Sequence, residues 1–561
     1  MSLIITYPTH SLARIFPQGE VPPHCDTFTA LRNEPLSFQI GYTVEEAPTT
    51  IFYLRVKSDL PLSLFDEGCV PLATTVNTVL TEQYTPGTFP DLLLPRRVNP
   101  PLTKIRATNR HARGNTTEQS GRIPQYANRD AIRALWFTVN EDGKNLIPGN
   151  YPITVEFYNV GDELIGSCTV TVRLLAATLP RQTLCYTNWF HCDCLADTYG
   201  VELWSEEFYR VFRHHVTAAA QHGMNMLLTP TFTPALDTPI DTERMTAQLV
   251  DVTVTDGVYS FGFDKLKRYV DEARGCGIRY FELAWLFTQW GARYAPKVMA
   301  TVNGKYRRLF GWQTAATSKK YMAFLRAYLP ALRDFLRTEG LEDKVLFHIS
   351  DEPDESNVDQ YRRASDMVRE LIGDCMLGDA LSHYEIYEQG LLNRPIVMTT
   401  HAHDFVGRTK HLWCYYTGGE LQEGASNRLI INTPERNRML GVQMYMCRME
   451  GFLHWAYNFY YGTMSQGLFN PLTEPHACGS TYMVYPNTDG TAIPSIRMKT
   501  FYEAINDMRA LQRLERLRGR RFAEELVRQH YGDVTMLTHP ESADKLLALR
   551  AAVNDAIAEV V

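Results

Sequence analysis

Two adjacent carboxylates, Asp351 and Glu352, follow an apolar run and directly precede a proline. The run 345–349 has the composition of a short buried strand, and Pro353 cannot donate to a sheet, so strand pairing must stop there. Neighbouring side chains on a strand point to opposite faces, so both acids can reach one ligand only where the strand gives way to a loop. Such a pair suits acid–base chemistry on a bound substrate. The alternative is that the two acids only cap the helix that follows.

A strand, an acidic tip and a helix in that order are typical of one unit of a parallel (β/α)8 barrel, in which catalytic side chains lie at the C-terminal strand ends. Strand-like runs alternate with helical patterns throughout residues 183–517. This alternation predicts an α/β fold with a TIM-like barrel as the catalytic domain. The eight candidate strands are 184–189, 226–229, 278–285, 345–349, 376–381, 395–398, 411–416 and 451–457.

The segments before and after the barrel have different patterns. Residues 1–182 contain short alternating runs separated by turn residues, which predicts a β-sandwich accessory domain. Within it, residues 95–131 are rich in Pro, Arg, Asn and Gly and show no period, so we expect a long loop that reaches toward the barrel cleft. Residues 518–561 predict a helical C-terminal extension. A hairpin is expected at Asp256-Gly257, because Asp-Gly suits a type I′ turn.

The composition excludes several classes of function. The 561 residues are 45% hydrophobic and 21% charged, with a formal net charge of −7. Dispersed charge of this sign argues against a nucleic-acid partner, and no apolar run is long enough to span a membrane. The N-terminus lacks the pattern of a secretion signal, and the 11 cysteines form no framework. We therefore expect a cytoplasmic protein with reduced thiols, or a secreted one whose leader has been removed.

Several local patterns occur in the order found in one known family. The chain over residues 130–515 resembles glycoside hydrolase family 123, the retaining β-N-acetylgalactosaminidases. It departs from the family pattern at Cys414, where a Trp-Trp-Tyr-like stretch is usual, and in lacking a visible secretion signal. We therefore expect a divergent member. The matching stretches are 134–139, 148–151, 218–228, Asp256-Gly257, 348–353, 412–416, 451–455 and 495–497.

The resemblance implies a substrate-assisted reaction that needs no cofactor. In it, the 2-acetamido oxygen of the sugar attacks the anomeric carbon, so no protein nucleophile is required. Glu352 would protonate the leaving oxygen and then activate water, while Asp351 would orient the acetamido N–H and stabilise its growing charge. These roles require an ionised Asp351 and a protonated Glu352. The implied partner is a glycan or glycoside with a terminal N-acetylhexosamine.

Other side chains near the predicted strand ends are candidates for substrate binding. Trp285, Trp413 and Trp455 are candidate sugar platforms, with core packing as the alternative for each. Either Tyr415 or Tyr416 could donate to the acetamido oxygen; only one can face inward, and we favour Tyr415. The remaining polar candidates for contacts with sugar hydroxyls are Asn188, His191, His403, Asp404 and Asn458.

Two short clusters also contain metal-ligand types. His191-Cys-Asp-Cys194 does not have the spacing of a structural zinc site, and His401-Ala-His-Asp404 follows the sixth candidate strand. We expect no metal at either cluster. Three other functions stay open: a glycosidase for a sugar without an acetamido group, a non-catalytic carbohydrate-binding protein, and a metal-dependent hydrolase that rests only on these two clusters.

Overall fold

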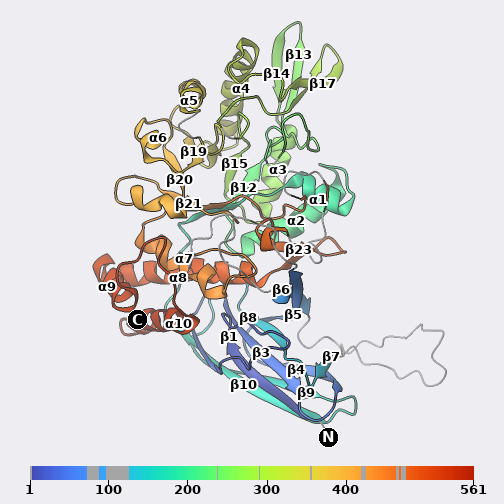
Figure 1. Ribbon diagram of the computed structural model, residues 1–561, viewed down its shortest axis with the longest axis vertical. Coiled ribbons are helices and arrows are strands. Elements are labelled where there is room, and N and C mark those ends of the chain that lie inside the picture. The colour runs from blue at the N-terminus through green and yellow to red at the C-terminus, as the bar shows by residue number, and fades with distance from the viewer. Residues whose placement is uncertain are drawn as a thin grey trace, which may run out of the picture.

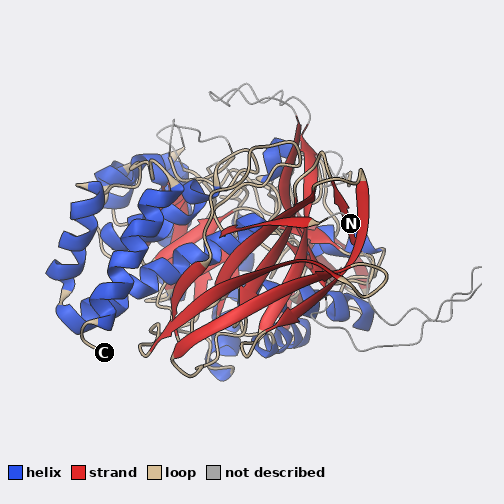
Figure 2. Ribbon diagram, turned by 90° about the horizontal axis from the view of Figure 1, so that it is seen from below, coloured by secondary structure: helices blue, strands red, loops and turns tan. Residues whose placement is uncertain are grey.

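The computed structural model describes residues 3–72, 87–96, 125–236, 238–289, 291–353, 357–418, 425–462, 467–468 and 476–561. A β-sandwich lies at one end of the molecule and a barrel at the other, with the last helices packed beside both (Figure 1). From below, the strands of the sandwich form a broad layer next to the C-terminal helices (Figure 2). Within the described ranges, no helix has the length and apolar character needed to cross a bilayer.

The sandwich consists of two five-stranded sheets. Alternate residues of β3, among them Phe38 and Ile40, enter the core between the sheets, where Phe38 stacks on Phe137 with ring centroids 5.0 Å apart. The first sheet has the order β1 (Ile4–His10), β3 (Leu36–Val44), β8 (Arg133–Val139), β5 (Leu62–Leu72), β6 (Gly87–Arg96). The second has the order β2 (Thr27–Leu31), β10 (Leu164–Leu175), β9 (Gly149–Tyr158), β4 (Thr49–Lys57), β7 (Gln125–Asn128).

The predicted loop over residues 95–131 is wrong at its C-terminal end. Residues 125–128 form strand β7, which pairs antiparallel with β4. The side chain of Gln125 donates to Asp66 at 2.6 Å and fixes the start of this strand. Residues 97–124, on which the rest of that prediction falls, lie outside the described residues.

The predicted barrel is confirmed. Eight parallel strands close in sequence order, and each coincides with one of the predicted runs. The seventh strand is shorter than predicted, because only residues 413–415 pair with both neighbours. The strands are β11 (Cys185–Asn188), β12 (Met226–Thr229), β15 (Tyr280–Leu283), β18 (Val345–Phe347), β19 (Met376–Leu381), β20 (Arg394–Met398), β21 (Trp413–Tyr415) and β22 (Gly451–His454).

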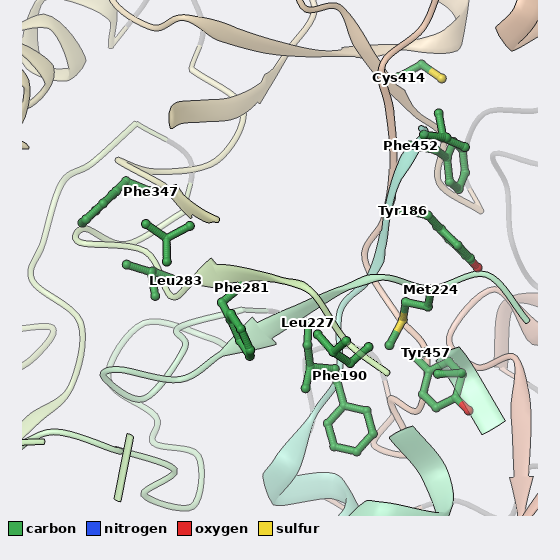
Figure 3. Close-up of a cluster of buried hydrophobic side chains, with 14 of the residues drawn as sticks. Tyr186, Phe190, Met224, Leu227, Phe281, Leu283, Phe347, Cys414, Phe452 and Tyr457 are labelled. Atoms are coloured by element: carbon green, nitrogen blue, oxygen red, sulfur yellow. The ribbon is translucent and has the colours of Figure 1, made fainter. Parts of the chain in front are cut away.

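Helices surround the barrel and bury its outer face. Their apolar sides pack on outward-pointing strand residues such as Phe281, Phe347 and Phe452, which belong to the largest apolar cluster of the molecule (Figure 3). Ser205 caps α2 by accepting from the Phe208 N–H at 3.1 Å. The helices are α1 (Cys192–Tyr199), α2 (Glu206–Gln221), α3 (Asp264–Gly275), α4 (Lys319–Thr338), α5 (Val358–Ile372), α6 (Tyr384–Glu388), α7 (Pro434–Met446) and α8 (Ile496–Arg518).

A four-stranded sheet projects from the barrel at the end far from the sandwich (Figure 1). The predicted Asp256-Gly257 hairpin joins β13 (Asp251–Thr255) to β14 (Val258–Gly262), and both turn residues have positive φ, as a type I′ turn requires. A second hairpin, absent from the sequence prediction, joins β16 (Val298–Val302) to β17 (Lys305–Phe310). Its turn is Asn303-Gly304, also with positive φ at both residues.

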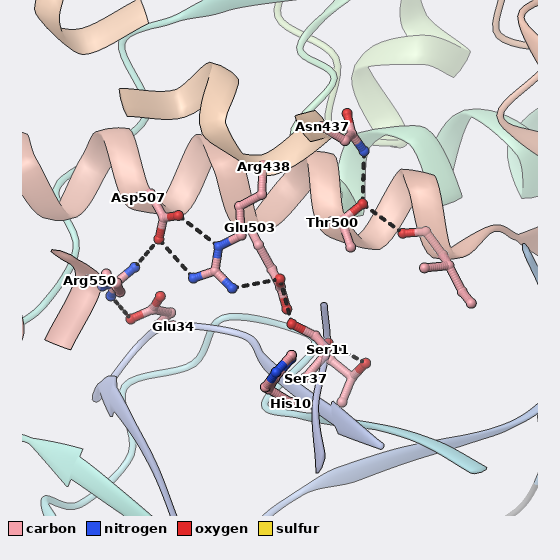
Figure 4. A network of polar contacts seen from close by, with 12 residues as sticks. His10, Ser11, Glu34, Ser37, Asn437, Arg438, Thr500, Glu503, Asp507 and Arg550 are labelled. Atoms are coloured by element: carbon pink, nitrogen blue, oxygen red, sulfur yellow. Dashed lines mark hydrogen bonds and ion pairs between the residues drawn. The ribbon is translucent and has the colours of Figure 1, made fainter. Parts of the chain in front are cut away.

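The C-terminal extension is helical, as predicted, and it ties the two main parts of the molecule together. Its helices are α9 (Arg520–Tyr531) and α10 (Ala543–Ala558). Arg550 on α10 forms ion pairs with Glu34 of the sandwich at 2.6 Å and with Asp507 of α8 at 2.7 Å (Figure 4). Short elements complete the described chain: the 3-10 helices η1 (Thr399–Asp404) and η2 (His476–Gly479), and strands β23 (Val484–Pro486) and β24 (Ala492–Pro494).

Candidate active site

Asp351 and Glu352 lie just past the C-terminal end of β18, at the mouth of the barrel. Strand pairing ends at Phe347, and the N–H of Glu352 donates to the Ala380 carbonyl at 3.1 Å. Glu352 has a φ of +46°, which is uncommon for a residue other than glycine. The regular alternation of the strand has therefore ended at the acidic pair, where Pro353 predicted that it would. Both acids keep part of their surface exposed.

Tyr415 holds Glu352 from across the barrel. It is the last residue of β21, faces the interior, and donates its hydroxyl to Glu352 Oε1 at 2.7 Å. Tyr416 is buried on the outer side of the barrel, where its ring packs on Phe452 with centroids 5.1 Å apart. Of the two tyrosines, only Tyr415 is in reach of the acidic pair.

A buried polar layer lies directly behind the pair. The Nδ1 of His348 hydrogen-bonds Asp379 at 2.9 Å, and its Nε2 hydrogen-bonds Glu282 at 2.7 Å. Asp379 also accepts the Tyr361 hydroxyl at 2.6 Å and the backbone N–H of Ser350 at 3.2 Å. This layer ties β15, β18 and β19 together immediately before the acidic pair.

Glu282 is further anchored by the first barrel strand. It accepts the hydroxyl of Thr187 at 2.6 Å and the indole N–H of Trp189 at 2.8 Å. Glu282, Asp379 and His348 expose almost none of their surface. Buried charges of this kind persist only when they are paired and hydrogen-bonded, and each of the three has at least two partners.

The electrostatics of this cluster are dominated by negative charge. Burial alone would lower the pKa of His348, but its hydrogen bonds to Asp379 and Glu282 raise it to about 10, so the ring is an imidazolium at neutral pH. Burial, followed by the charges of Glu352 and Asp379, raises the pKa of Asp351 well above its ordinary value. Four acidic side chains therefore surround one cation, and this excess of negative charge disfavours the ionised form of Asp351.

The three candidate tryptophans occupy different positions. Trp285 follows β15, is 4% exposed, and stacks on His348 with ring centroids 5.1 Å apart. Trp455 follows β22 and stays partly exposed at the barrel mouth. Trp413 begins β21 at the opposite end of the strand, where a Cβ added to Gly451 would lie 2.1 Å from its ring. Trp413 is thus a core residue at the barrel floor, and its prediction as a sugar platform is wrong.

Asn188 does not face the site. Its side chain lies on the outer side of the barrel, donates to the Tyr186 hydroxyl at 2.6 Å and accepts from Arg428 at 2.8 Å. Residues 186 and 188 are two positions apart on β11 and share this outer face, whereas Thr187 points inward. The prediction of a substrate contact by Asn188 is contradicted by this orientation.

His191 and Asn458 are engaged with each other. The Asn458 side chain accepts the His191 N–H at 2.8 Å and donates to the His191 carbonyl at 3.2 Å. The imidazole contacts the Trp455 carbonyl and Arg244, and burial lowers its pKa to about 3. These two residues position the loop that carries Trp455, and both are buried.

The two candidate metal clusters do not gather ligands. Asp193 is paired with Arg244 at 2.7 Å inside the first cluster. In the second, His403 and Asp404 lie on η1 after β20, with side chains 64% and 48% exposed and His403 Nε2 3.5 Å from Asp404 Oδ1. Across the described part of the chain, no group of three or more His, Cys, Asp or Glu side chains is placed to hold a metal. His403 and Asp404 remain accessible near the barrel mouth.

Sequence analysis assigned no role to Glu282, Asp379 or Tyr361. The first two stand inside the predicted strands 278–285 and 376–381, which are otherwise mostly apolar. An acidic residue in a buried strand is rarely tolerated without a partner, and that was the available signal. Tyr361 carried no such signal, because a tyrosine on the apolar face of an amphipathic helix is indistinguishable from a core residue in the sequence.

Comparison with known proteins agrees with this geometry. The family model described as glycoside hydrolase 123, catalytic domain, matches residues 189–514. A family 123 glycoside hydrolase from Clostridium perfringens, studied for glycolipid glycan hydrolysis, superposes with a TM-score of 0.71 at 12% identity, covering 100% of this chain and 98% of that one. No curated protein sequence matches.

Other solved glycosidases superpose less well. A family 5 mannosidase from Rhizomucor miehei has a TM-score of 0.33 at 13% identity, covering 61% of this chain and 95% of that one. A β-glucuronidase from Parabacteroides merdae has a TM-score of 0.30 at 9% identity, covering 86% and 51%.

Proposed function

Because the chain belongs to glycoside hydrolase family 123, we propose that it releases β-linked N-acetylgalactosamine from glycans with retention of configuration. The observation that carries this proposal is the adjacent pair Asp351 and Glu352 at the mouth of the barrel, with Glu352 held by Tyr415. Two neighbouring acids serve a substrate-assisted reaction, because the nucleophile comes from the sugar. A protein nucleophile would need its carboxyl about 5 Å from the acid, on the opposite side of the scissile bond.

In the proposed first step, the acetamido oxygen attacks the anomeric carbon as the bond to the leaving oxygen breaks. Glu352 gives its proton to that oxygen, and Asp351 accepts a hydrogen bond from the acetamido N–H, which becomes positively charged. The product of this step is a cyclic oxazolinium and a released alcohol. In the second step, Glu352 takes a proton from water, and the water oxygen attacks the anomeric carbon. The oxazolinium ring opens, and the sugar regains its original configuration.

The raised pKa of Asp351 in the ligand-free site gives substrate binding a defined electrostatic role. The acetamido N–H is a donor and favours the ionised form of Asp351, and the nearby His348 imidazolium acts in the same direction. We infer that binding of the acetamido group therefore favours the ionised Asp351 that the proposed first step requires. The site is thus primed only when an acetamido sugar is present.

The substrate contacts that we propose are those that remain accessible. Trp455 at the barrel mouth is the stacking platform, and Trp285 lies deeper, against His348. His403 and Asp404 on η1 are exposed and can reach sugar hydroxyls at the rim. The proposed substrate class is a glycan or glycoside with a terminal N-acetylhexosamine.

The direct test is activity of the purified protein on nitrophenyl β-glycosides of N-acetylgalactosamine, N-acetylglucosamine, galactose and glucose, each with and without a chelator. We expect cleavage of the first, weaker or no cleavage of the second, none of the last two, and no chelator effect. NMR of the first-formed sugar should show the β anomer. An α product, or chelator-sensitive activity restored by metal, would overturn the proposal.

A further inference from the structure

A small cavity lies where the sandwich, the barrel loop after β21 and the first turns of α7 and α8 meet. Its volume is about 20 Å³. A cavity of this size has room for about one water-sized particle. Three of its lining residues are arginines, namely Arg14, Arg428 and Arg497, and one is acidic, Asp91. The cavity is on the far side of the barrel wall from the acidic pair, since Arg428 reaches Asn188 on the outer face of β11.

The positive charge around this cavity is only partly neutralised. Arg497 is paired with Asp91 through two hydrogen bonds of 2.9 Å. Arg428 is 1% exposed, and its partners Asn188, His454 and the Ala456 carbonyl are all uncharged. Among the described residues, no carboxylate is within ion-pair distance of it.

Arg14, from the sandwich, is partly exposed, and the nearby charges of Glu435 and Asp91 favour its charged form. It donates to the carbonyls of Ile430 and Ile431 at 2.9 and 2.8 Å, and no carboxylate of the described chain pairs with it. Burial lowers the pKa of Arg14 and of Arg428 to about 10, so both are charged at neutral pH. A buried cation without a counter-charge is costly, and Arg428 is such a cation.

A buried amide with no partner adds to the argument. Asn432 lines the cavity and is 7% exposed. Neither its side-chain Nδ2 nor its Oδ1 has a hydrogen-bond partner in the described structure. Native proteins leave few buried polar groups unsatisfied, and each such group calls for an explanation. An anion in the cavity would accept a hydrogen bond from the Asn432 Nδ2 N–H.

Two helices begin at the same place. Helix α7 starts at Thr433 and Pro434, and helix α8 starts at Ile496 and Arg497. All four of these residues line the cavity. The first turn of a helix carries unsatisfied N–H groups and a partial positive charge. The start of α8 therefore adds to the field of the arginines, whereas Glu435 in the first turn of α7 partly offsets it.

We propose that this cavity is a binding site for a single chloride ion. The excess of guanidinium charge, the unpartnered Asn432 amide and the start of α8 all favour an anion, and the volume favours a monatomic one. The ion would contact residues of the sandwich, the barrel loop and both helices at once, so it would act as a structural link between them. The site is separate from the proposed glycosidase chemistry, and its test does not depend on it.

The first experiment is thermal melting of the full-length protein in sodium chloride, sodium bromide or sodium gluconate at matched ionic strength. A ligand that binds only the folded state raises Tm in a saturable way. We expect a saturable rise of about 2 °C or more with chloride and with bromide, and none with gluconate, which is too large for the cavity. Identical melting in all three salts would overturn the proposal.

Two variants and one control localise the effect. Asn432→Leu replaces the amide that lines the cavity with an apolar group of similar size. Arg14→Gln removes one lining charge at a partly exposed position. Arg173→Gln, on the exposed face of β10, removes the same charge from a residue without an ion pair in the described chain. We expect the halide response to vanish in the first variant, weaken in the second and persist in the control. A full response in Asn432→Leu would place the ion elsewhere.

Crystals grown with bromide give a direct answer that does not depend on any variant. The anomalous signal of bromide should appear as a peak in the cavity, within hydrogen-bond distance of the Asn432 amide. Ordinary water there, with no anomalous peak at high bromide concentration, would overturn the proposal whatever the melting data show.

Discussion

Two buried ionic clusters in the described part of the chain differ in charge balance. The cluster behind the barrel mouth brings four carboxylates together with one cation. Glu282 and Asp379 hold the His348 imidazolium between them at 2.7 and 2.9 Å, while Asp351 and Glu352 stand in front of it. Burial and the excess of negative charge raise the pKa of Asp351.

The second cluster joins the sandwich to α7, α8 and α10 and is nearly balanced (Figure 4). Arg438 pairs with Glu503 at 2.9 Å and with Asp507 at 2.7 Å, and Arg550 pairs with Glu34 at 2.6 Å and with Asp507 at 2.7 Å. Burial would raise the pKa of Asp507, but Arg438 and Arg550 lower it. Here the charges fix one another in place.

The contrast suggests a rule for this chain. Where every carboxylate has a guanidinium partner, as in the second cluster, the cluster contributes to the position of whole elements. Where several carboxylates share a single cation, as in the first cluster, the cluster is suited to proton transfer. If the rule holds, substitutions in the first cluster should change rate and pH dependence, and substitutions in the second should change stability alone.

The largest effect is expected from Glu352→Gln. A general acid contributes about 10² to 10⁴ in rate, so the loss on substrates with poor leaving groups should be of that order. Aryl glycosides with activated leaving groups need less protonation and should lose less in the first step. Pre-steady-state kinetics on both substrate types give the comparison. Glu450→Gln, at the exposed start of β22, is the matched control and should leave the rate unchanged.

Asp351→Asn should come next. Asparagine can hydrogen-bond the acetamido group but cannot stabilise its positive charge, so kcat should fall more than KM rises. A thiazoline analogue of the cyclic intermediate should inhibit the wild type strongly and the variant weakly. If Asp351 is only a helix cap, the variant should instead lose about 1 kcal/mol of stability and turn over normally per folded molecule. Melting and kinetics of the same preparation separate these two outcomes.

His348→Gln should have an intermediate effect on rate and a distinctive effect on pH dependence. The imidazolium lowers the pKa of Asp351, so its removal raises that pKa further. The acid limb of kcat/KM should therefore move to higher pH. His215→Gln is a suitable control, because burial lowers the pKa of His215 to about 3 and its loss removes no charge. If the acid limb does not move, His348 does not influence the pKa of Asp351.

The charge of His348 should also make the stability of the protein depend on pH. The folded-state pKa of His348, about 10, is above its ordinary value of 6.5. The contribution of the His348 charge to the free energy of unfolding is therefore fully present below about pH 6.5 and is lost as pH rises through 10. This contribution is on the order of 5 kcal/mol for the wild type. We expect the wild type to lose stability across that interval and His348→Gln to start lower and change less.

The barrel could be predicted from the sequence because its signal is local. Each strand is a short apolar run followed by a helix, and the Asp351 and Glu352 pair is contiguous in the chain. The hairpin at Asn303-Gly304 carried an equally local turn signal, but its flanking strands alternate weakly and were missed. The short strand 125–128 was missed because its pairing partner lies more than 70 residues earlier.

Most of the site beyond the acidic pair could not be predicted. Whether a strand residue faces the interior depends on register, which shifts every side chain to the other face when it moves by one position. Asn188 was placed on the wrong side of the barrel for this reason. Trp413 was placed at the wrong end, because the strand begins at Trp413, two residues later than predicted. The His348 contacts join residues 66 and 31 positions apart, and no local pattern indicates them.

The smallest effect on catalysis, and a large one on stability, is expected from Arg550→Met. The change leaves Glu34 and Asp507 buried with fewer partners, and breaking a buried ion pair by removing one member costs about 3 to 5 kcal/mol. Arg518→Met is the matched control, because its ion pair with Glu559 is largely exposed and should contribute less than about 1 kcal/mol. The double variant Arg550→Met with Glu34→Gln should regain part of the loss, since it removes one stranded charge.

Activity per folded molecule should be unchanged in all three of these variants, because the balanced cluster holds elements in place and exchanges no proton with the site. The measurement is thermal melting beside kcat, with the folded fraction determined at the assay temperature. A fall in kcat of Arg550→Met beyond its loss of folded protein would contradict the division of roles between the two clusters. It would mean that the position of α8 and α10 is transmitted to the barrel mouth, and that charge balance alone does not separate structure from catalysis in this chain.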